Sequence, residues 1–350
     1  MRVGVDARPL TVPTFGIGRY TEELLTRMVC SNEDHEWFFY VDRPLRGDWP
    51  VNVKIREFSS HQRFLSLLRT QLTFAHWAEL DELQVFWSPR HHLSLFMKTP
   101  QVLTVHDMVW RKCPETMLFA NLMVERFLMP PSVKRASVVV TDSEASKRDI
   151  LDELGTSEDK ITVVYPGATL GDLPPAESEF EDDYFLFLGT NEPRKNLPGL
   201  VSAHRRYISE GGKYRLVIAG GVGWGSGFVP HKEVDVLGYV DESRLAGLFY
   251  HSKASVLPSF YEGFGLPLLE AIQRGTPVIA GNVSAMPEVV GEAGILVDPL
   301  DISALTVALH QMSDESKRQV YADQCKEQAA KFSWDNAATS ILQILERVAR

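Results

Sequence analysis

The sequence lacks any apolar run long enough to cross a membrane. A spanning helix needs about 18 to 20 consecutive apolar residues, and the richest stretch, residues 117–129, is interrupted by Asn121, Glu125 and Arg126. The first residues also place the carboxylate of Asp6 where a signal peptide would have its apolar segment. We therefore expect a cytoplasmic protein that meets a membrane only peripherally, at the inner face.

Cysteine is scarce, and positive charge is not in excess. Cys30, Cys113 and Cys325 are widely separated, which predicts reduced thiols and excludes a disulfide framework or a zinc site built from paired cysteines. The formal net charge of −10 argues against a general nucleic-acid binder, because such a protein presents a basic face. With 44% hydrophobic and 23% charged residues, the composition is that of an ordinary folded protein.

Short apolar runs alternate with segments of helical period along the whole chain. This alternation is typical of doubly wound α/β domains with buried parallel sheets, and 350 residues suffice for two of them. We predict Rossmann-like domains over 1–170 and 171–332, an acidic linker near 171–183, and a C-terminal helix over 333–350 that packs back towards the first domain. The predicted strands are 2–5, 37–41, 85–87, 101–105, 137–141, 161–164, 184–188, 214–219, 234–237, 254–257, 277–280 and 294–297.

Two carboxylates flank a glycine turn in the second half. Glu262 precedes Gly263 and Gly265, and Glu270 follows in a segment where Pro267 suits the first turn of a helix. Glycines there let main-chain N–H groups approach an anion, and carboxylates accept hydrogen bonds from sugar hydroxyls. The alternative is that Glu262 only complements the helix dipole and Glu270 is a solvated helix residue.

A second loop follows the predicted strand 184–188. It carries Arg194 and Lys195 directly before Asn196, which suits a helix N-cap. Strand ends of a parallel sheet share one edge, so these cations would lie near the glycine turn and stabilise a departing diphosphate. An isolated arginine–lysine pair on a protein surface is more often only solvated. The prediction of an anion site therefore depends on the glycine turn lying beside these two cations.

These segments resemble retaining glycosyltransferase family 4, whose members have the GT-B fold. The resemblance is carried by residues 189–196, 238–241, 262–270 and 275–279, and covers the first half only in pieces. It implies two Rossmann-like domains facing across a cleft. It also implies a hexosyltransferase that uses a nucleotide diphosphate sugar and retains the anomeric configuration.

The resemblance assigns roles to matching residues of the second half. Glu262 would contact the donor hexose, Glu270 the ribose hydroxyls, and Arg194 with Lys195 the diphosphate. Thr190, a donor-binding candidate, departs from the family, because many members have an arginine there. The remaining donor-binding candidates are the main chain of Gly263, Phe264, Gly265 and Leu266, and Tyr239 and Val240, which would face the base.

The first half contributes two candidate loops. The turn formed by Gly16, Ile17 and Gly18 opens a predicted helix and resembles the family loop that closes over the donor phosphates. His106 ends the predicted strand 101–105; such a histidine is more often structural, but the matching family histidine points at the donor sugar. No Asp-x-Asp motif lies near the donor segments, so we expect no metal and no cofactor.

Two other motifs are assigned no part in donor binding. Residues 220–227 are glycine-rich, but they lack the lysine and hydroxyl residue that end a phosphate-binding P-loop, so we interpret them as a mobile loop. Asp142 and Ser143 precede a predicted helix, and either one suits its N-cap.

Two segments of the first half combine basic and apolar side chains. Residues 53–75 and 111–135 could lie on an anionic membrane as amphipathic segments, or their leucines could simply pack against the first sheet. In 53–75 the side chains concerned are Lys54, Arg56, Arg63, Phe64, Leu65, Leu67, Leu68, Arg69 and Leu72.

The identities of the donor and the acceptor are predicted only from a resemblance to particular members of the family. Residues 5–8, 18–20 and 189–196 resemble bacterial polysaccharide mannosyltransferases, including those of lipopolysaccharide synthesis. This favours GDP-mannose as donor, with UDP-hexoses next, and a glycan or lipid-linked glycan as acceptor. The alternatives are a nucleotide-sugar epimerase or phosphorylase of related fold, and a non-enzymatic two-domain solute-binding protein.

Overall fold

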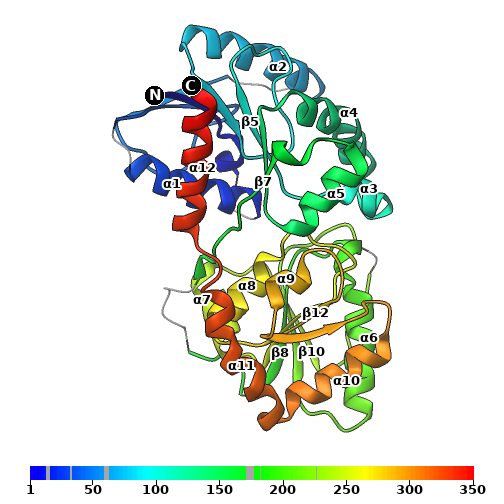
Figure 1. The fold of residues 1–350 in the computed structure, drawn as a ribbon. Coiled ribbons are helices and arrows are strands. Elements are labelled where there is room, and N and C mark those ends of the chain that lie inside the picture. Colours follow the sequence, from blue (N-terminus) through cyan, green and yellow to red (C-terminus); the bar gives the residue numbers. More distant parts are fainter. Residues whose placement is uncertain (13–15, 32–33, 59–62, 171–176, 182, 226) are drawn as a thin grey trace. The chain divides into compact units, whose positions relative to one another are not determined.

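The structure is a computed structural model that describes residues 1–12, 16–31, 34–58, 63–170, 177–181, 183–225 and 227–350, with the side chains of 63–69 outside the description. The chain divides into two compact units, each with its own parallel sheet (Figure 1). The first unit comprises 1–110, 119–167 and 333–350, and the second comprises 111–118 and 168–332. The expected linker lies partly outside the described residues.

The described part of the first unit contains a seven-stranded sheet of order β3-β2-β1-β4-β5-β6-β7, with every pairing parallel. Its strands are β1 Arg2–Asp6, β2 Glu36–Val41, β3 Val53–Glu57, β4 Val85–Ser88, β5 Gln101–Val105, β6 Val138–Thr141 and β7 Ile161–Val163. Its helices are α1 Ile17–Ser31, α2 Arg63–Leu80, α4 Phe119–Arg135, α5 Glu144–Leu154 and α12 Trp334–Ala349, with short 3₁₀ helices η1 Arg8–Thr11 and η3 Glu158–Lys160. After residue 110 the chain leaves this unit, and residues 111–118 belong to the second. This stretch includes η2 Pro114–Thr116 and the end of the short helix α3 Val109–Lys112.

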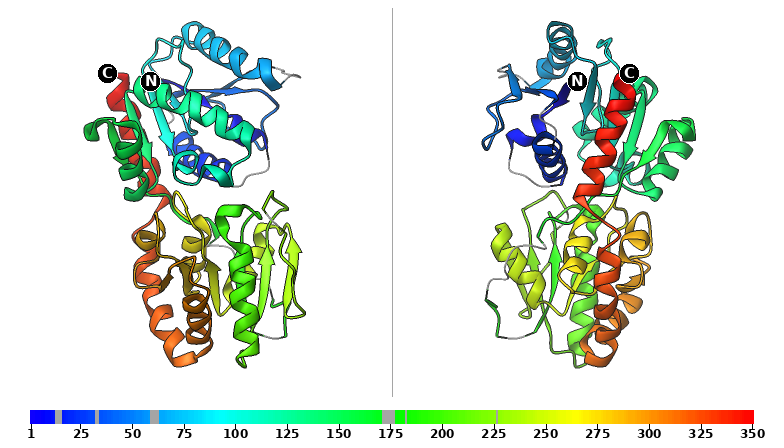
Figure 2. Two further views of the ribbon diagram at one scale, coloured as in Figure 1. Left: turned by 90° about the vertical axis from the view of Figure 1, so that its right-hand side faces the viewer. Right: turned by 60° about the vertical axis from the view of Figure 1, so that its left-hand side comes forward.

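The C-terminal helix α12 belongs to the first unit, where it lies beside α1 in every view (Figures 1 and 2). The guanidinium Nε of Arg27 on α1 lies 2.7 Å from Oδ1 of Asp335 on α12. The ring of Trp334 packs against that of Tyr20 with centroids 6.0 Å apart. The last residues of the chain thus complete the layer that covers one side of the first sheet.

Strand β3 was not predicted from the sequence. It is the edge strand of the first sheet, and four of its five residues are exposed, so it lacks the continuous apolar run that identifies a buried strand. Lys54 and Arg56 lie on it, where they form ion pairs with Glu36 and Asp81. Residues 53–57 therefore form an edge strand and not part of an amphipathic helix, because a strand orients alternate side chains to opposite faces.

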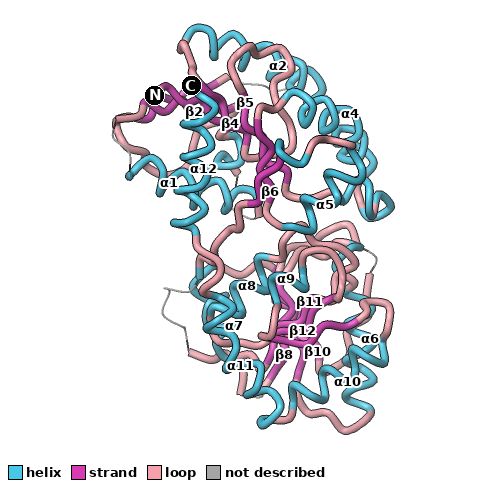
Figure 3. The backbone as a smooth tube through the Cα atoms, viewed as in Figure 1, coloured by secondary structure: helices cyan, strands magenta, loops and turns pink. Residues whose placement is uncertain are grey.

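The second unit contains, in its described part, a six-stranded parallel sheet of order β10-β9-β8-β11-β12-β13. Helices flank both faces of this sheet (Figure 3), as expected for a doubly wound α/β domain. The strands are β8 Tyr184–Leu188, β9 Arg215–Ala219, β10 Val234–Gly238, β11 Ala254–Leu257, β12 Val278–Gly281 and β13 Gly294–Val297. The helices are η5 Pro193–Lys195, α6 Leu197–Ser209, α7 Glu242–His251, α8 Leu266–Gln273, α9 Met286–Val290, α10 Ile302–Ser313 and α11 Glu315–Ala329.

The predicted fold class is confirmed, and each of the predicted strands is present with ends that differ by at most one residue. Most strands are buried on both faces: β2, for example, reads Glu-Trp-Phe-Phe-Tyr-Val, and all but its first residue are buried. Within the described ranges, no helix combines the length and the apolar character needed to span a bilayer.

Candidate active site

The strand order of the second sheet reverses between β8 and β11, which are adjacent although two strands separate them in sequence. In open α/β sheets, the loops that follow the two strands at such a point diverge and leave room for a ligand at the carboxyl edge. The loop after β8 carries Arg194 and Lys195, and the loop after β11 carries Glu262. The topology therefore brings both predicted donor loops to one place.

Arg194 and Glu262 join the two loops directly. Nη1 of Arg194 lies 2.5 Å from Oε2 of Glu262 and donates a second bond to the carbonyl oxygen of Tyr261 at 3.1 Å. Nε of Arg194 donates to Glu192 at 2.8 Å. The main chain adds a further link, because the amide of Phe260 donates to the carbonyl of Arg194 at 2.7 Å. The guanidinium is thus held by two carboxylates in a fixed orientation.

Glu262 is a buried, ion-paired carboxylate. Burial by itself would raise its pKa, but the charges of Arg194 and Lys195 and hydrogen bonds from Arg194 and Ser259 outweigh that effect, so the pKa lies below its ordinary value. Ser259 Oγ donates to Oε1 at 2.9 Å, and the Glu262 amide donates to Ser284 Oγ at 2.9 Å. The interpretation of Glu262 as a simple helix-dipole charge is therefore wrong.

Lys195 is buried and lies over Gly189, where a methyl group in place of the glycine hydrogen would overlap with its Nζ atom. Its ammonium group forms no hydrogen bond or ion pair with any residue in the described part of the chain. Burial lowers its pKa and the charge of Arg194 lowers it further, while the charges of Glu262 and Glu192 act in the opposite direction. A buried cation without a bonded partner is costly, so this position suits a group that receives an anion.

The glycine turn forms as predicted. Gly265 has a φ of +99°, which few other residues adopt, and α8 begins at the next residue with Pro267 in its first turn. Glu270 lies inside this helix and is only 2% exposed, so the interpretation of Glu270 as a solvated helix residue is wrong. The main chain of residues 263–266 precedes and opens α8, where N–H groups lack helical partners and can bind an anion.

Asn196 occupies the predicted N-cap position of α6, but its side chain makes no capping hydrogen bond. Its backbone is left-handed, with φ +53°. Its Nδ2 donates a hydrogen bond of 2.6 Å to the carbonyl oxygen of Pro299. The side chain thereby ties the loop after β8 to the segment before α10. The position was thus predicted correctly, and the capping bond is absent because the side chain of Asn196 bonds to Pro299 instead.

The glycine-rich residues 220–225 pack on the loop after β8. The amide of Asn191 donates to the carbonyl of Gly221, and the amide of Gly225 donates back to the carbonyl of Asn191 at 2.8 Å. A methyl group at Gly223 would overlap with the Asn191 carbonyl. Gly220, Gly223 and Gly225 are therefore needed for close approach to the loop after β8, which the interpretation of a mobile loop missed.

The segment expected to face the base follows β10. Gly238 ends the strand with a φ of +69°, Tyr239 is 64% exposed and Val240 is buried. Asp241 then caps α7 by accepting a hydrogen bond from the amide of Arg244 at 2.9 Å. Since β10 is separated from β8 only by β9, this segment lies at the same carboxyl edge as the donor loops.

In the first unit, the turn at Gly16 opens α1 as predicted. Gly16 has a φ of +48°, and its carbonyl accepts the first helical hydrogen bond from the amide of Tyr20 at 2.9 Å. Ile17 and Gly18 are the first residues of α1. Residues 13–15, which precede the turn, lie outside the described residues.

His106, at the end of β5, makes hydrogen bonds with both ring nitrogens inside the first unit. Nδ1 lies 2.6 Å from Oδ2 of Asp142, and Nε2 lies 2.9 Å from the carbonyl oxygen of Pro89. The ring of Tyr20 packs edge-on at a centroid distance of 4.8 Å. His106 is thus fixed in orientation. For Nε2 to bond a sugar hydroxyl, it would have to give up its hydrogen bond to the carbonyl oxygen of Pro89.

Of the two residues predicted as possible caps of α5, Ser143 is the cap, because its side chain accepts a hydrogen bond from the amide of Ser146. Asp142 instead orients His106, because strands β5 and β6 are neighbours and both residues follow their strand ends. Glu192 and Ser259, which position Arg194 and Glu262, were also missed. Each lies in the same loop as the residue that it positions, Glu192 after β8 and Ser259 after β11.

Groups of three or more histidine, cysteine or acidic side chains arranged to hold a metal ion do not occur among the described residues.

Two family models match the chain, one over each half. Residues 16–171 match the model described as Glycosyltransferase Family 4, and residues 174–332 match the model described as Glycosyl transferases group 1. The O-antigen chain mannosyltransferase B of Escherichia coli is 30% identical, in an alignment that covers 98% of both chains.

Solved structures share the fold. A sucrose-phosphate synthase from Thermosynechococcus elongatus superposes with a TM-score of 0.81 over 99% of this chain and 98% of its own, at 17% identity. WaaG, a glycosyltransferase involved in lipopolysaccharide biosynthesis, superposes with a TM-score of 0.75 over 99% of each chain, at 14% identity.

Proposed function

This chain belongs to the family 4 glycosyltransferases with the GT-B fold, and on that premise we propose that it moves mannose from GDP-mannose to a glycan acceptor with retention of the anomeric configuration. The relative that aligns along nearly the whole chain is a mannosyltransferase of O-antigen synthesis, which supports mannose as the sugar and polysaccharide synthesis as the context. The hexosyl transfer itself follows from the family.

The observation that carries the donor site is the buried ammonium group of Lys195 beside the Arg194–Glu262 ion pair. A nucleotide diphosphate brings the negative charge that this ammonium group lacks. Preorganised cations also stabilise the transition state more than the ground state, because charge develops on the leaving phosphate as the glycosidic bond breaks. In this proposal, Lys195 and Arg194 supply the positive charge that a metal ion would otherwise provide.

The proposed transfer breaks the bond between the anomeric carbon and the β-phosphate oxygen and forms a bond from the acceptor hydroxyl oxygen to the same face of that carbon. The acceptor proton passes to the departing phosphate oxygen. Glu262 holds hydroxyls of the donor hexose, Glu270 holds those of the ribose, and His106 contacts the sugar. No covalent nucleophile takes part.

The acceptor is proposed to be a glycan carried on a lipid, and α4 supports a membrane contact. Phe119 and Phe127 on this helix are 76% and 70% exposed. They are about 80° apart around the helix axis, with the exposed Arg126 about 20° from Phe119. Apolar side chains mixed with a basic one on a helix surface suit the headgroup region of an anionic bilayer.

The experiment that tests this function is thermal unfolding with GDP, UDP, GDP-mannose and UDP-glucose in EDTA. A ligand at a hundredfold its dissociation constant stabilises the native state by about 2.7 kcal/mol, which raises the melting temperature by several degrees. Lys195→Ala should lose the shift, while Lys213→Ala, which removes an exposed lysine of the same unit, should keep it.

Product analysis then defines the reaction. Transfer from GDP-mannose to a glycan, with an α linkage in the product from the α-linked donor, supports the proposal. Stabilisation by UDP and not by GDP would replace the donor with a UDP-hexose. A changed nucleotide sugar in the absence of acceptor would show an epimerase, and no shift with any nucleotide would remove the donor site.

A further inference from the structure

The first sheet has its own switch point, between β1 and β4, where the strand order reverses. The loop after β1 begins with Ala7 and Arg8, and the loop after β4 begins with Pro89 and Arg90. By the topological argument that places the donor site in the second unit, the loops after β1 and β4 mark a second ligand position. Both loops bring an arginine to it.

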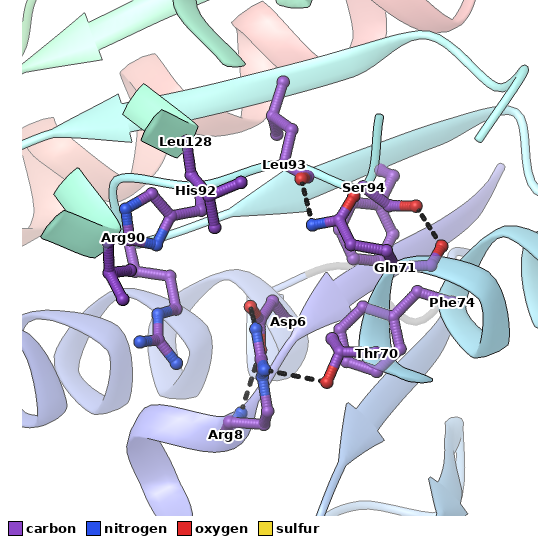
Figure 4. Close-up of a pocket in the computed structure, with 12 residues that line it drawn as sticks. Asp6, Arg8, Thr70, Gln71, Phe74, Arg90, His92, Leu93, Ser94 and Leu128 are labelled. Atoms are coloured by element: carbon purple, nitrogen blue, oxygen red, sulfur yellow. Dashed lines mark hydrogen bonds and ion pairs between the residues drawn. The ribbon is translucent and has the colours of Figure 1, made fainter. Parts of the chain in front are cut away.

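A cavity of about 50 Å³ lies at this point, entirely within the first unit. Figure 4 shows Arg8 against the carboxylate of Asp6 at its centre, with Arg90 and His92 along one side and Thr70, Gln71 and Ser94 along the other. The remaining lining residues are Phe74, Phe86, Leu93, Val124 and Leu128.

Arg8 is paired within the protein. Its Nε and Nη2 atoms donate to the two oxygens of Asp6 at 2.7 and 2.6 Å, and its Nη1 donates to Thr70 Oγ1 at 3.2 Å. These bonds use three of the five N–H groups of a guanidinium. Two N–H groups of Arg8 therefore remain for a ligand, in an orientation that Asp6 fixes.

Arg90 is different, because its guanidinium forms no hydrogen bond or ion pair with any residue in the described ranges, although it lines the cavity. Burial lowers its pKa and the charge of Arg8 lowers it further, while the charges of Asp6, Glu125 and Asp42 act in the opposite direction. The side chain of Arg90 is half-buried, and it is costly to remove a guanidinium from water when it has no bonded partner in the described ranges. It resembles Lys195 at the switch point of the other sheet.

We propose that the pocket between Arg8 and Arg90 binds a phosphoryl group of the acceptor substrate, which makes the acceptor a phosphorylated glycan or sugar. This rests on the proposed function, because it names the chemistry of the second substrate. One water needs about 10 to 15 Å³ of such space, so the cavity holds a group of roughly three to five heavy atoms and excludes a hexose ring. A phosphoryl group has this size and offers oxygens to both guanidinium groups, whose planar forks match it.

The phosphoryl group could belong to a soluble sugar phosphate or to the diphosphate of a lipid carrier. The test titrates the full chain, with the donor site filled by GDP or UDP, against inorganic phosphate, glucose 6-phosphate and farnesyl diphosphate, and measures each dissociation constant by calorimetry. The variant is Arg90→Gln, which removes no bond within the described protein, and the matched control is Arg46→Gln, which removes an exposed charge of the same unit.

We expect at least one of these probes to bind the wild type and to bind Arg90→Gln about tenfold to a hundredfold more weakly, which is the loss of one or two charge-assisted hydrogen bonds. Arg46→Gln should bind like the wild type. Tighter binding of farnesyl diphosphate than of glucose 6-phosphate identifies a lipid-linked acceptor, and the reverse order identifies a soluble one.

Absence of binding to the wild type, or equal binding to Arg90→Gln, would overturn the proposal and leave Arg90 as a charge that balances the surrounding carboxylates. Nucleotide binding is measured first on the same samples. If nucleotides bind normally while the phosphate probes do not, the acceptor pocket fails and the proposed transferase stands.

Discussion

Arg194 and Glu262 form a largely buried ion pair, Nη1 to Oε2 2.5 Å, with side chains 19% and 10% exposed. The desolvation of two charges offsets most of their attraction, so such a pair contributes little net stability compared with apolar residues. Its position is more informative, because it joins the two loops at the switch point of the sheet beside Lys195. An incoming diphosphate can take over one bond of Arg194 while Glu192 keeps the guanidinium in place.

The first prediction concerns the pH dependence of this pair. The pKa of Glu262 is lowered from 4.5 in the folded state, so its contribution to stability is present above about pH 4.5 and is lost as the pH falls through the folded pKa. Glu262→Gln should therefore be less stable than the wild type by about 1–3 kcal/mol at pH 7, and this difference should shrink below pH 4.5. Urea unfolding at pH 7, 5 and 3.5 measures it.

The matched control is Glu327→Gln, which changes an exposed glutamate on α11 of the same unit. It should alter the free energy of unfolding by less than about 0.5 kcal/mol at each pH. A difference between Glu262→Gln and the wild type that stays constant down to pH 3.5 would show that Glu262 is not stabilised by the cations.

The second prediction uses the packing of Lys195 over Gly189. A methyl group at position 189 would overlap with Nζ of Lys195, so Gly189→Ala should displace the ammonium group and weaken nucleotide binding by about tenfold or more. Gly221→Ala places its methyl group in open space in a neighbouring loop and should bind nucleotide like the wild type. Calorimetric titration compares the two variants, and equal affinities would mean that Lys195 does not contact the diphosphate.

The strands could be predicted from the sequence because most of them are buried on both faces and read as apolar runs. Strand β3 could not be predicted, because it is an exposed edge strand that carries Lys54 and Arg56. It forms only by pairing with β2. Pairing of this kind is a tertiary property that local composition does not reveal.

In the candidate site, too, the sequence predicts some features and not others. The proximity of Arg194, Lys195 and Glu262 could be predicted because they occupy loops that directly follow predicted strands, and the parallel order of the sheet brings those loops together. The contacts among side chains were not found. Asp142, for instance, lies two residues before a helix and suits a cap, and only the register between β5 and β6 brings it to His106.

The third prediction concerns His204, which is fully buried in α6. Burial lowers the pKa of His204 from 6.5 to about 4, while its hydrogen bond to the carbonyl of Tyr214 acts in the opposite direction and His231 lowers the pKa further. The unfolded chain therefore binds one more proton than the folded chain between pH 6.5 and 4. Stability should fall by about 3 kcal/mol over this range because of this residue.

In His204→Phe this component is absent, so the slope of unfolding free energy against pH between 6.5 and 4 should be smaller than in the wild type. The variant is also less stable at pH 7, because the carbonyl of Tyr214 loses its donor. Denaturant unfolding across this pH range gives both values. An unchanged slope would mean that His204 is protonated in the folded protein.

The last prediction tests the membrane contact of α4. Burial of a phenylalanine side chain is worth about 1.5–3 kcal/mol, so replacing the exposed Phe119 and Phe127 with serine should reduce binding to anionic vesicles by at least tenfold. Because Arg126 lies beside Phe119 on the same helix surface, binding should also weaken when salt is raised or when the vesicles are neutral. Cosedimentation with vesicles of phosphatidylglycerol and phosphatidylcholine measures both effects. Val320→Ser, at a 61% exposed apolar residue of the second unit, serves as the control, and equal sedimentation of all three proteins would place the membrane contact elsewhere.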